Sequence, residues 1–222
     1  MLLNSIIIIP IIASLLIGFL GKDYLRLNYF IALSSSLIVF LLSLYLLYLF
    51  DPLSTEFQFQ TQMNWITQFN IQYFIGIDGI SLPLILLTTF ITPLVIITSN
   101  TSQKKDLHQY LAAFLILETL MIGVFSSLDA FLFYIFWEAM LIPMFIIIGV
   151  WGGKNRIYAT VKFFLYTFLG SVFMLLALIY LYFKTGSYAI NDFYNANLSL
   201  NEQIIIFLAF LFAFGVKIPM WP

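Results

Sequence analysis

Residues 133–144, FYIFWEAMLIPM, place one acid, Glu138, in the middle of an apolar run. The apolar sequence extends on both sides to the roughly 20 residues that an α-helix needs to cross a hydrocarbon core. On membrane-insertion scales a charge at the centre of such a helix costs about 2.5–3.5 kcal/mol, so it normally faces a bundle interior, a partner or a water path. The stretch therefore predicts a membrane-spanning helix in which Glu138 either contacts a partner group or has a functional role.

Similar apolar runs recur along the whole chain. Of the 222 residues, 63% are hydrophobic and 9% charged, whereas soluble domains carry roughly 25% charged residues. Only helices and closed barrels pair every backbone amide in lipid, and long runs of Leu, Ile and Phe without alternation favour helices. We expect an all-α, polytopic transmembrane helical bundle that forms a single membrane domain over residues 1–222. Its seven helices are predicted at roughly residues 2–20, 28–50, 79–98, 108–127, 129–150, 157–183 and 204–222.

The basic residues predict the orientation of this bundle. Six of them follow odd-numbered helices, and Lys184 alone follows an even-numbered one; the six are Lys22, Arg26, Lys104, Lys105, Lys154 and Arg156. Because Lys and Arg concentrate in inward-facing loops, the N-terminus is predicted to face outward. The loop at 51–78 then also faces outward, and its partial alternation suggests a short hairpin or an amphipathic surface segment. Asp78 and Asp129 are predicted helix caps.

The composition excludes several classes of function. The chain has no Cys, so disulfides, thiol catalysis and iron–sulfur ligation are excluded, and its single His108 cannot form a metal site alone. A net charge of −1 argues against a nucleic-acid partner. No glycine-rich nucleotide motif is present. The first apolar run has no positive flank or small-residue cleavage site, so a retained helix is expected rather than a signal peptide.

Two acids inside the predicted helices are candidate proton-carrying groups. Counted from the turn at 126–129, Glu118 and Glu138 lie about 12 and 13.5 Å deep at 1.5 Å per residue. Glu138 is either a proton carrier or a protonated acid bonded to Tyr134, one turn earlier. Pro143 weakens the helix beside it. For Glu118 the structural and the functional alternatives stay open.

Two lysines inside the predicted helices complete the candidate set. Lys217 lies about 20 Å into the last helix, where Gly215 and two prolines predict a bend or a break. Broken helices within the membrane often hold ion sites in transporters, whereas the alternative, a snorkelling lysine, requires a nearby helix end. Lys162 is only about six residues into its helix. It is either a snorkelling structural lysine or a peripheral member of a proton path.

Three motifs in order resemble one known family. They are GIDGISLPLILLTTF at 76–90, FYIFWEAMLIPMFIIIGVWGGKNRIYATVKFFLYTFLGS at 133–171 and FAFGVKIPMWP at 212–222. This series resembles the antiporter-like subunits of respiratory complex I, NADH:quinone oxidoreductase, and within them the subunit 4 or M-type branch. The resemblance extends over all 222 residues.

The resemblance implies a fold, a function and a site. It implies half of a 14-helix subunit built from two inverted five-helix repeats, in which Glu138 and Lys217 form a buried pair within a proton-translocating half-channel. The chain would then be a membrane-arm subunit of a proton-translocating NADH:ubiquinone reductase, surrounded by other membrane-arm subunits and lipid. Flavin, iron–sulfur clusters and quinone sites would lie in other subunits, so no cofactor is expected in this chain.

Several alternatives remain open at this point. Members of the family are more than twice as long, which leaves a partial sequence, a subunit split between two polypeptides, or a truncated remnant. The same acid and lysine are also expected in an Mrp-type cation/proton antiporter subunit, and a non-pumping scaffold is a third possibility. The abundance of Ile, Phe, Tyr and Asn suggests an AT-rich gene, which fits either a mitochondrial inner membrane or a bacterial plasma membrane.

Overall fold

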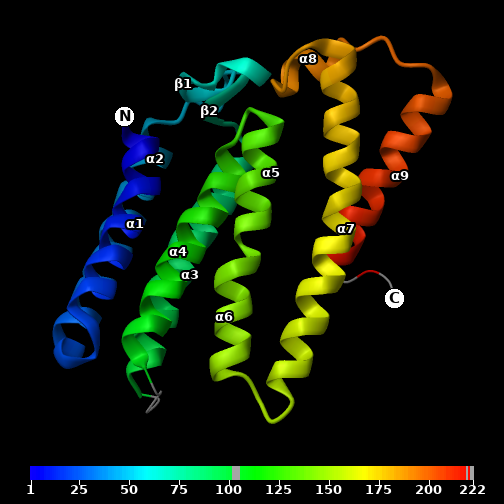
Figure 1. Ribbon diagram of the computed structural model, residues 1–222. Coiled ribbons are helices and arrows are strands. Elements are labelled where there is room, and N and C mark those ends of the chain that lie inside the picture. The colour runs from blue at the N-terminus through cyan, green and yellow to red at the C-terminus, as the bar shows by residue number, and fades with distance from the viewer. Residues whose placement is uncertain (102–105, 219, 221–222) are drawn as a thin grey trace.

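The computed structural model describes residues 1–101, 106–218 and 220. It is a bundle of long helices with one β-hairpin at one end (Figure 1). The helices are α1 (Leu2–Leu20), α2 (Leu25–Leu49), α3 (Ser81–Thr101), α4 (Leu107–Ser126), α5 (Ala130–Ala139), α6 (Leu141–Trp151), α7 (Arg156–Thr185), α8 (Ile190–Tyr194) and α9 (Leu200–Lys217). The strands are β1 (Gln58–Ile66) and β2 (Ile71–Ile77).

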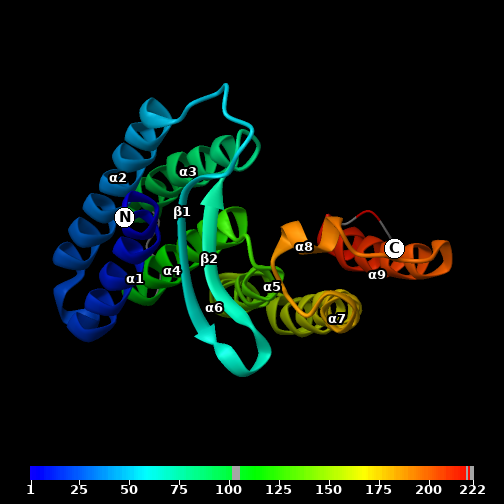
Figure 2. The same cartoon turned by 90° about the horizontal axis from the view of Figure 1, so that it is seen from above.

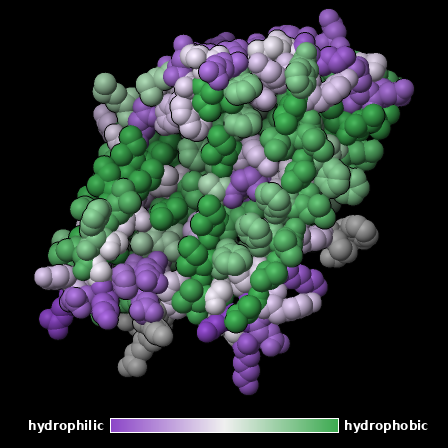
Figure 3. All heavy atoms as spheres, viewed as in Figure 1, coloured by the Kyte–Doolittle hydropathy of each residue, from purple (hydrophilic) through white to green (hydrophobic). Residues whose placement is uncertain are grey.

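The helices have the length and composition of membrane spans. Within the described ranges, six stretches are long and apolar enough to cross a bilayer, and the first of them, Leu2–Leu49, contains both α1 and α2. Because α1 and α2 pack against each other, that stretch crosses twice. The surface has a hydrophobic belt between two polar ends (Figure 3). The predicted all-α transmembrane bundle is therefore confirmed, and among the described residues the hairpin forms its only β-sheet.

Basic residues gather where the chain turns at one end of the bundle. Lys22 lies in the turn between α1 and α2, and Lys154 lies in the turn between α6 and α7. Both turns lie at the end opposite the N-terminus (Figure 1). Lys104 and Lys105, on which the predicted orientation also depended, fall outside the described residues. The described geometry thus separates these basic turns from the face that carries the hairpin.

The 51–78 loop forms the antiparallel hairpin β1–β2 on the opposite face. Seen from above, the hairpin lies across the ends of α1, α4 and α5 (Figure 2). Its inner residues Ile75 and Ile77 are fully buried and belong to a core cluster that also contains residues of α1, α2 and α3. The hairpin therefore closes this end of the bundle by burying apolar side chains.

Asp129 joins the hairpin to the helix that carries Glu138. Its Oδ1 accepts the N–H groups of Phe131 and Leu132, each at 2.9 Å, which caps α5. Its Oδ2 accepts the N–H of Gln72 in β2 at 3.1 Å. Burial raises the pKa of the Asp129 carboxyl, and the three amide donors offset only part of that effect. The predicted cap is present, and it also anchors the hairpin.

Asp78 caps the start of α3 on the same face. Its Oδ1 accepts the N–H of Ser81 at 2.8 Å and that of Ile80 at 3.1 Å. Burial alone would raise the pKa of Asp78, but its hydrogen bonds with Ser81 and Ile80 outweigh burial and the pKa is lowered. Both aspartates therefore cap a helix, but the pKa of Asp129 is raised and the pKa of Asp78 is lowered.

Candidate functional site

Glu138 lies one residue before the end of α5, next to an interruption of the helix. The single helix expected over 129–150 is divided at Met140 into α5 and α6. Pro143 has no N–H to give to the carbonyl of Ala139, and its ring crowds that carbonyl. Met140 has helical dihedral angles, φ −59° and ψ −25°, so the chain direction is kept. The acid therefore lies where the backbone hydrogen-bond ladder is incomplete.

Lys217, the last residue of α9, reaches across to this interruption. Its Nζ donates to the carbonyl oxygen of Trp137 at 3.2 Å and lies 4.5 Å from the centre of the Trp137 ring. The one ion pair within 4 Å among the described residues joins other side chains, so Glu138 and Lys217 are neighbours rather than a contact ion pair. The structure thus brings the predicted pair together through the residue that precedes the acid.

The helix that carries Lys217 differs in detail from its prediction. We expected a span over 204–222 that bends near Gly215, but α9 begins at Leu200, continues through Gly215 and ends at Lys217. Pro219 and Pro222, the other expected causes of a break, lie outside the described residues. A capping box of Ser199 and Glu202 explains the earlier start. Lys217 accordingly lies at the carboxy-terminal end of α9.

Other polar groups surround Glu138 without satisfying it. Ser171 of α7 lies beside both the Glu138 carboxyl and the Tyr134 phenol, but its hydroxyl donates to the Phe168 carbonyl of its own helix at 2.9 Å. The Oε1 of Glu138 is buried and has no hydrogen-bond partner. The hydrogen bond from Glu138 to Tyr134 that one alternative required is not formed among the described residues. Glu138 thus has free acceptor capacity beside a cation.

Glu118 lies on the opposite side of the α4–α5 pair. It is fully buried, and neither carboxyl oxygen has a hydrogen-bond partner. The nearest hydroxyl is that of Thr92 in α3, and it donates to the Thr88 carbonyl at 3.0 Å. No cation acts on Glu118 among the described residues. A buried carboxylate without a donor or a counter-charge is costly, whereas a neutral acid can donate to the Thr92 oxygen.

Lys162 is separate from both acids. Its side chain is exposed near the start of α7, and its Nζ lies 6.0 Å from the ring centre of Tyr158. The structure brings Glu138 and Lys217 together, whereas Glu118 and Lys162 have no contact with that pair among the described residues.

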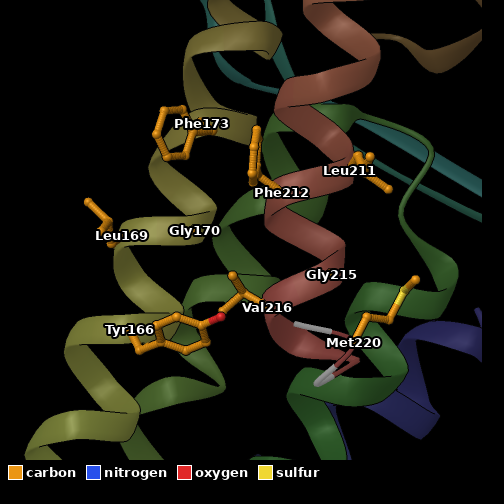
Figure 4. Close-up of a pocket in the computed structure, with 9 residues that line it drawn as sticks. All are labelled: Tyr166, Leu169, Gly170, Phe173, Leu211, Phe212, Gly215, Val216 and Met220. Atoms are coloured by element: carbon orange, nitrogen blue, oxygen red, sulfur yellow. The ribbon is translucent and has the colours of Figure 1, made fainter. Parts of the chain in front are cut away.

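α9 is held against α7 at a close approach beside the site. A Cβ built on Gly170 would lie 3.0 Å from Cβ and Cγ2 of Val216, the residue before Lys217. Figure 4 shows Gly170 facing Val216, next to an open apolar groove of about 380 Å³ between the two helices. Tyr166 is the one ionisable residue among its described lining residues. The lining of the groove is therefore almost entirely apolar, and the charged site lies beside it.

Sequence reasoning missed Trp137 and Ser171. Trp137 was not singled out by the sequence, although its place next to Glu138 was a signal. Ser171 follows a glycine within a long apolar helix, and a small polar residue there was a weaker signal. Across the described residues, no three His, Cys, Asp or Glu side chains gather as a metal-binding group. That this chain holds no cofactor remains a prediction.

Family models and known proteins match the whole length of the chain. Residues 1–125 match the model described as NADH-ubiquinone oxidoreductase chain 4, amino terminus, and residues 127–222 match the transmembrane model described as NADH:quinone oxidoreductase/Mrp antiporter. NADH-ubiquinone oxidoreductase chain 4 of Arabidopsis thaliana is 44% identical over 221 residues, which are 99% of this chain and 45% of that protein. NADH-quinone oxidoreductase subunit M of Rickettsia prowazekii is 44% identical over 199 residues, 89% of this chain and 40% of that protein.

A solved structure has the same fold. A chain in the structure of respiratory complex I from Thermus thermophilus with bound NADH superimposes with a TM-score of 0.86 at 26% identity, covering 99% of this chain and 44% of that one. The chain therefore spans less than half the length of the relatives it matches. The family model that covers residues 1–125 accounts for more than half of the chain. On these matches, the chain belongs to the chain 4, or subunit M, family of NADH:quinone oxidoreductase.

Proposed function

We propose that the chain is a proton-translocating part of the membrane arm of an NADH:ubiquinone oxidoreductase. The observation that carries this proposal is the meeting of Lys217 with the Trp137–Glu138 segment inside the apolar belt. A lysine and an acid that lie close but not in contact can exchange a proton through an intervening group at modest cost. The electrons from NADH pass through other chains, which supply flavin, iron–sulfur clusters and quinone.

The proposed roles follow from the positions of the four candidate residues. Glu138 and Lys217 exchange the translocated proton. Glu118 has no cation beside it among the described residues, and it joins the path only if water reaches it. Lys162 is exposed near one end of α7 and acts, if at all, at the entrance of the path. The partners are the other membrane-arm subunits and the lipid of a mitochondrial inner membrane or a bacterial plasma membrane, since relatives come from both sources.

Replacing Glu138 by Gln tests this function. In the assembled complex, Glu138→Gln removes the proton-accepting group at nearly constant volume, so the ratio of protons pumped to NADH oxidised should fall while the chain is still incorporated. Glu56→Gln is the matched control, because it removes the same charge from an exposed loop. Normal coupling in the assembled Glu138→Gln complex would overturn the relay role and favour a scaffold.

The same preparation separates the pump from an Mrp-type antiporter, which the carboxy-terminal family model also covers. A membrane-arm subunit should co-purify with NADH oxidation that is sensitive to quinone-site inhibitors. An antiporter should instead exchange sodium for protons without NADH.

A further inference from the structure

The interruption at Met140 frees a backbone acceptor at Trp137. In an unbroken α-helix the Trp137 carbonyl would accept the N–H of Leu141, four residues on. The helical ladder stops at Ala139 and restarts at Leu141, so this bond is not formed. The bonds on either side are long: Met140 N to Phe136 O is 3.2 Å and Met144 N to Met140 O is 3.3 Å. An unpaired carbonyl inside a membrane protein needs a donor from elsewhere.

Lys217 supplies that donor. Its ammonium donates to the Trp137 carbonyl at 3.2 Å, so it takes the position that the Leu141 N–H would otherwise occupy. The face of the Trp137 ring lies 4.5 Å away from the same nitrogen, within the range of a cation–π contact. One residue thus offers two separate attractions to the cation, one from its backbone and one from its side chain.

The ring is held in this position by its neighbours. Phe133 stacks on it at a centroid distance of 5.5 Å and 28°, and Phe214 meets it edge-on at 5.5 Å and 83°. These residues belong to the cluster that joins α5, α7 and α9. Its indole nitrogen is buried without a hydrogen-bond partner. The ring is therefore fixed by packing and not by a polar contact of its own.

Both attractions depend on the charge of Lys217. A charge-assisted hydrogen bond is roughly twice as strong as a neutral one, and a cation–π contact requires the cation. Loss of the proton would therefore weaken both contacts at once and leave the Trp137 carbonyl available to Leu141. Among the described residues, the titratable groups that face this ammonium are Glu138 and, through it, Tyr134.

We propose that Trp137 is a positioning residue that holds the charged form of Lys217 at the helix interruption, and that loss of the proton lets the α5–α6 backbone close. This rests on the proposed proton-translocating function and deepens it. In this proposal the hydrogen bonding of the backbone at 137–141 depends on the charge of Lys217. A change in the protonation of Lys217 therefore opens or closes the helix next to Glu138. A direct ion pair between Glu138 and Lys217 is then only one state of the site. In the resting state, Lys217 is bound to Trp137 instead.

The first test is the pH dependence of coupling in the assembled complex. Trp137→Leu removes the ring but keeps the carbonyl, so the charged lysine is less favoured. The protons pumped per NADH are plotted against pH, and one limb of this curve reflects protonation of Lys217. This limb should move to lower pH by about 0.5–1.5 units, the range that a cation–π contact supplies. Trp137→Phe keeps an aromatic face and should restore most of the wild-type profile. Phe136→Leu removes a ring from the same helix that packs against Gly123 of α4 and not on Trp137, so it should leave the limb in place.

The second test measures the backbone and does not need pumping. In the assembled complex, Lys217→Met removes the competing donor, so Leu141 can bond to Trp137 and hydrogen–deuterium exchange of the peptide containing residues 140–145 should slow. Equal exchange in Lys217→Met and wild type would overturn the competition for the carbonyl. An unmoved pH limb in Trp137→Leu would overturn the role of the ring. If either result is obtained and the Glu138→Gln complex no longer pumps protons, only the positioning role of Trp137 is refuted. If the Glu138→Gln complex still couples NADH oxidation to pumping, the proposed function is refuted instead.

Discussion

The close approach of α7 and α9 makes Gly170→Ala the sharpest test of how Lys217 is positioned. The added methyl would lie 3.0 Å from two atoms of Val216 and 3.3 Å from a third. Carbon atoms prefer to be about 3.5–4.0 Å apart, so α9 must retreat by roughly half an ångström. Overpacking of this kind costs about 1–3 kcal/mol, and the better helix propensity of Ala returns about 0.5–1 kcal/mol. The expected net loss lies between about 0 and 2.5 kcal/mol, with a central value of about 1 kcal/mol.

Gly215→Ala is the matched control for this change. It makes the same substitution in the facing helix, but its Cβ would meet no atom within 4 Å, so it should stabilise by about 0.5–1 kcal/mol. For a chain of this size 1 kcal/mol corresponds to about 2–4 °C. Heating the purified membrane assembly and quantifying protease-resistant peptides of this chain would measure both midpoints. Gly170→Ala should also reduce pumping, because Lys217 moves with α9.

Gly170→Ala would contradict this contact if it melted at or above the wild-type temperature, together with Gly215→Ala, and left pumping unchanged. That result would mean that α7 and α9 are not in contact at Gly170 in the assembled protein. Retained stability with reduced pumping would instead show that α9 yields easily and that only the lysine geometry suffers.

Three further changes test the helix caps on the hairpin side of the bundle and the packing of α5. Asp129→Ala removes an N-cap and the partner of the half-buried N–H of Gln72, which should cost about 1–3 kcal/mol in the same melting assay. A loss below about 0.5 kcal/mol would contradict the anchoring role. The pKa of Asp78 is lowered from 3.8 on folding, so its contribution to the free energy of unfolding is complete above pH 3.8 and is lost as the pH falls through the folded value. Asp78→Asn should therefore flatten the acid side of the plot of stability against pH. An unchanged plot would exclude the Asp78 cap as the source of this pH dependence. Gly123→Ala would place a methyl 2.6 Å from the Phe136 ring, so it should destabilise by about 1–3 kcal/mol, unless the ring can rotate away, which a neutral midpoint would reveal.

The membrane spans could be predicted because each depends on its own sequence. A helix in lipid satisfies its backbone internally, so length and hydropathy suffice to place it. The caps at Asp78 and Asp129 were also local, since the carboxylate binds amides two or three residues away. The loop at 51–78 left two alternatives open because a short alternating segment fits a hairpin or a surface helix equally. Burial of Ile75 and Ile77 against the bundle, which selects the hairpin, is a tertiary effect.

The geometry of the site could be predicted only in part. Charge and depth identified Glu138 and Lys217, because an ionisable residue within an apolar run is conspicuous. The contact that joins them could not be found this way. It needs the Trp137 carbonyl to be unpaired and α9 to end beside it, and both conditions depend on how α5, α7 and α9 assemble. Pro143 indicated that a backbone carbonyl near Glu138 would be unpaired. The carbonyl that Pro143 affects directly, however, is that of Ala139 and not that of Trp137.

The two acids show why depth alone does not define a relay. Glu118 and Glu138 were expected at similar depths on neighbouring antiparallel helices, and by that measure they were equivalent. The structure turns Glu118 toward Thr92 in α3, without a cation, and Glu138 toward α7 and α9, beside one. A proton moves reversibly only where its charged and neutral states differ little in free energy, which requires a compensating charge nearby. Among the described residues, Glu138 has such a charge beside it and Glu118 does not. We therefore assign the proposed proton-carrying role to Glu138 because of the direction in which its helix presents the acid, and not because of its depth.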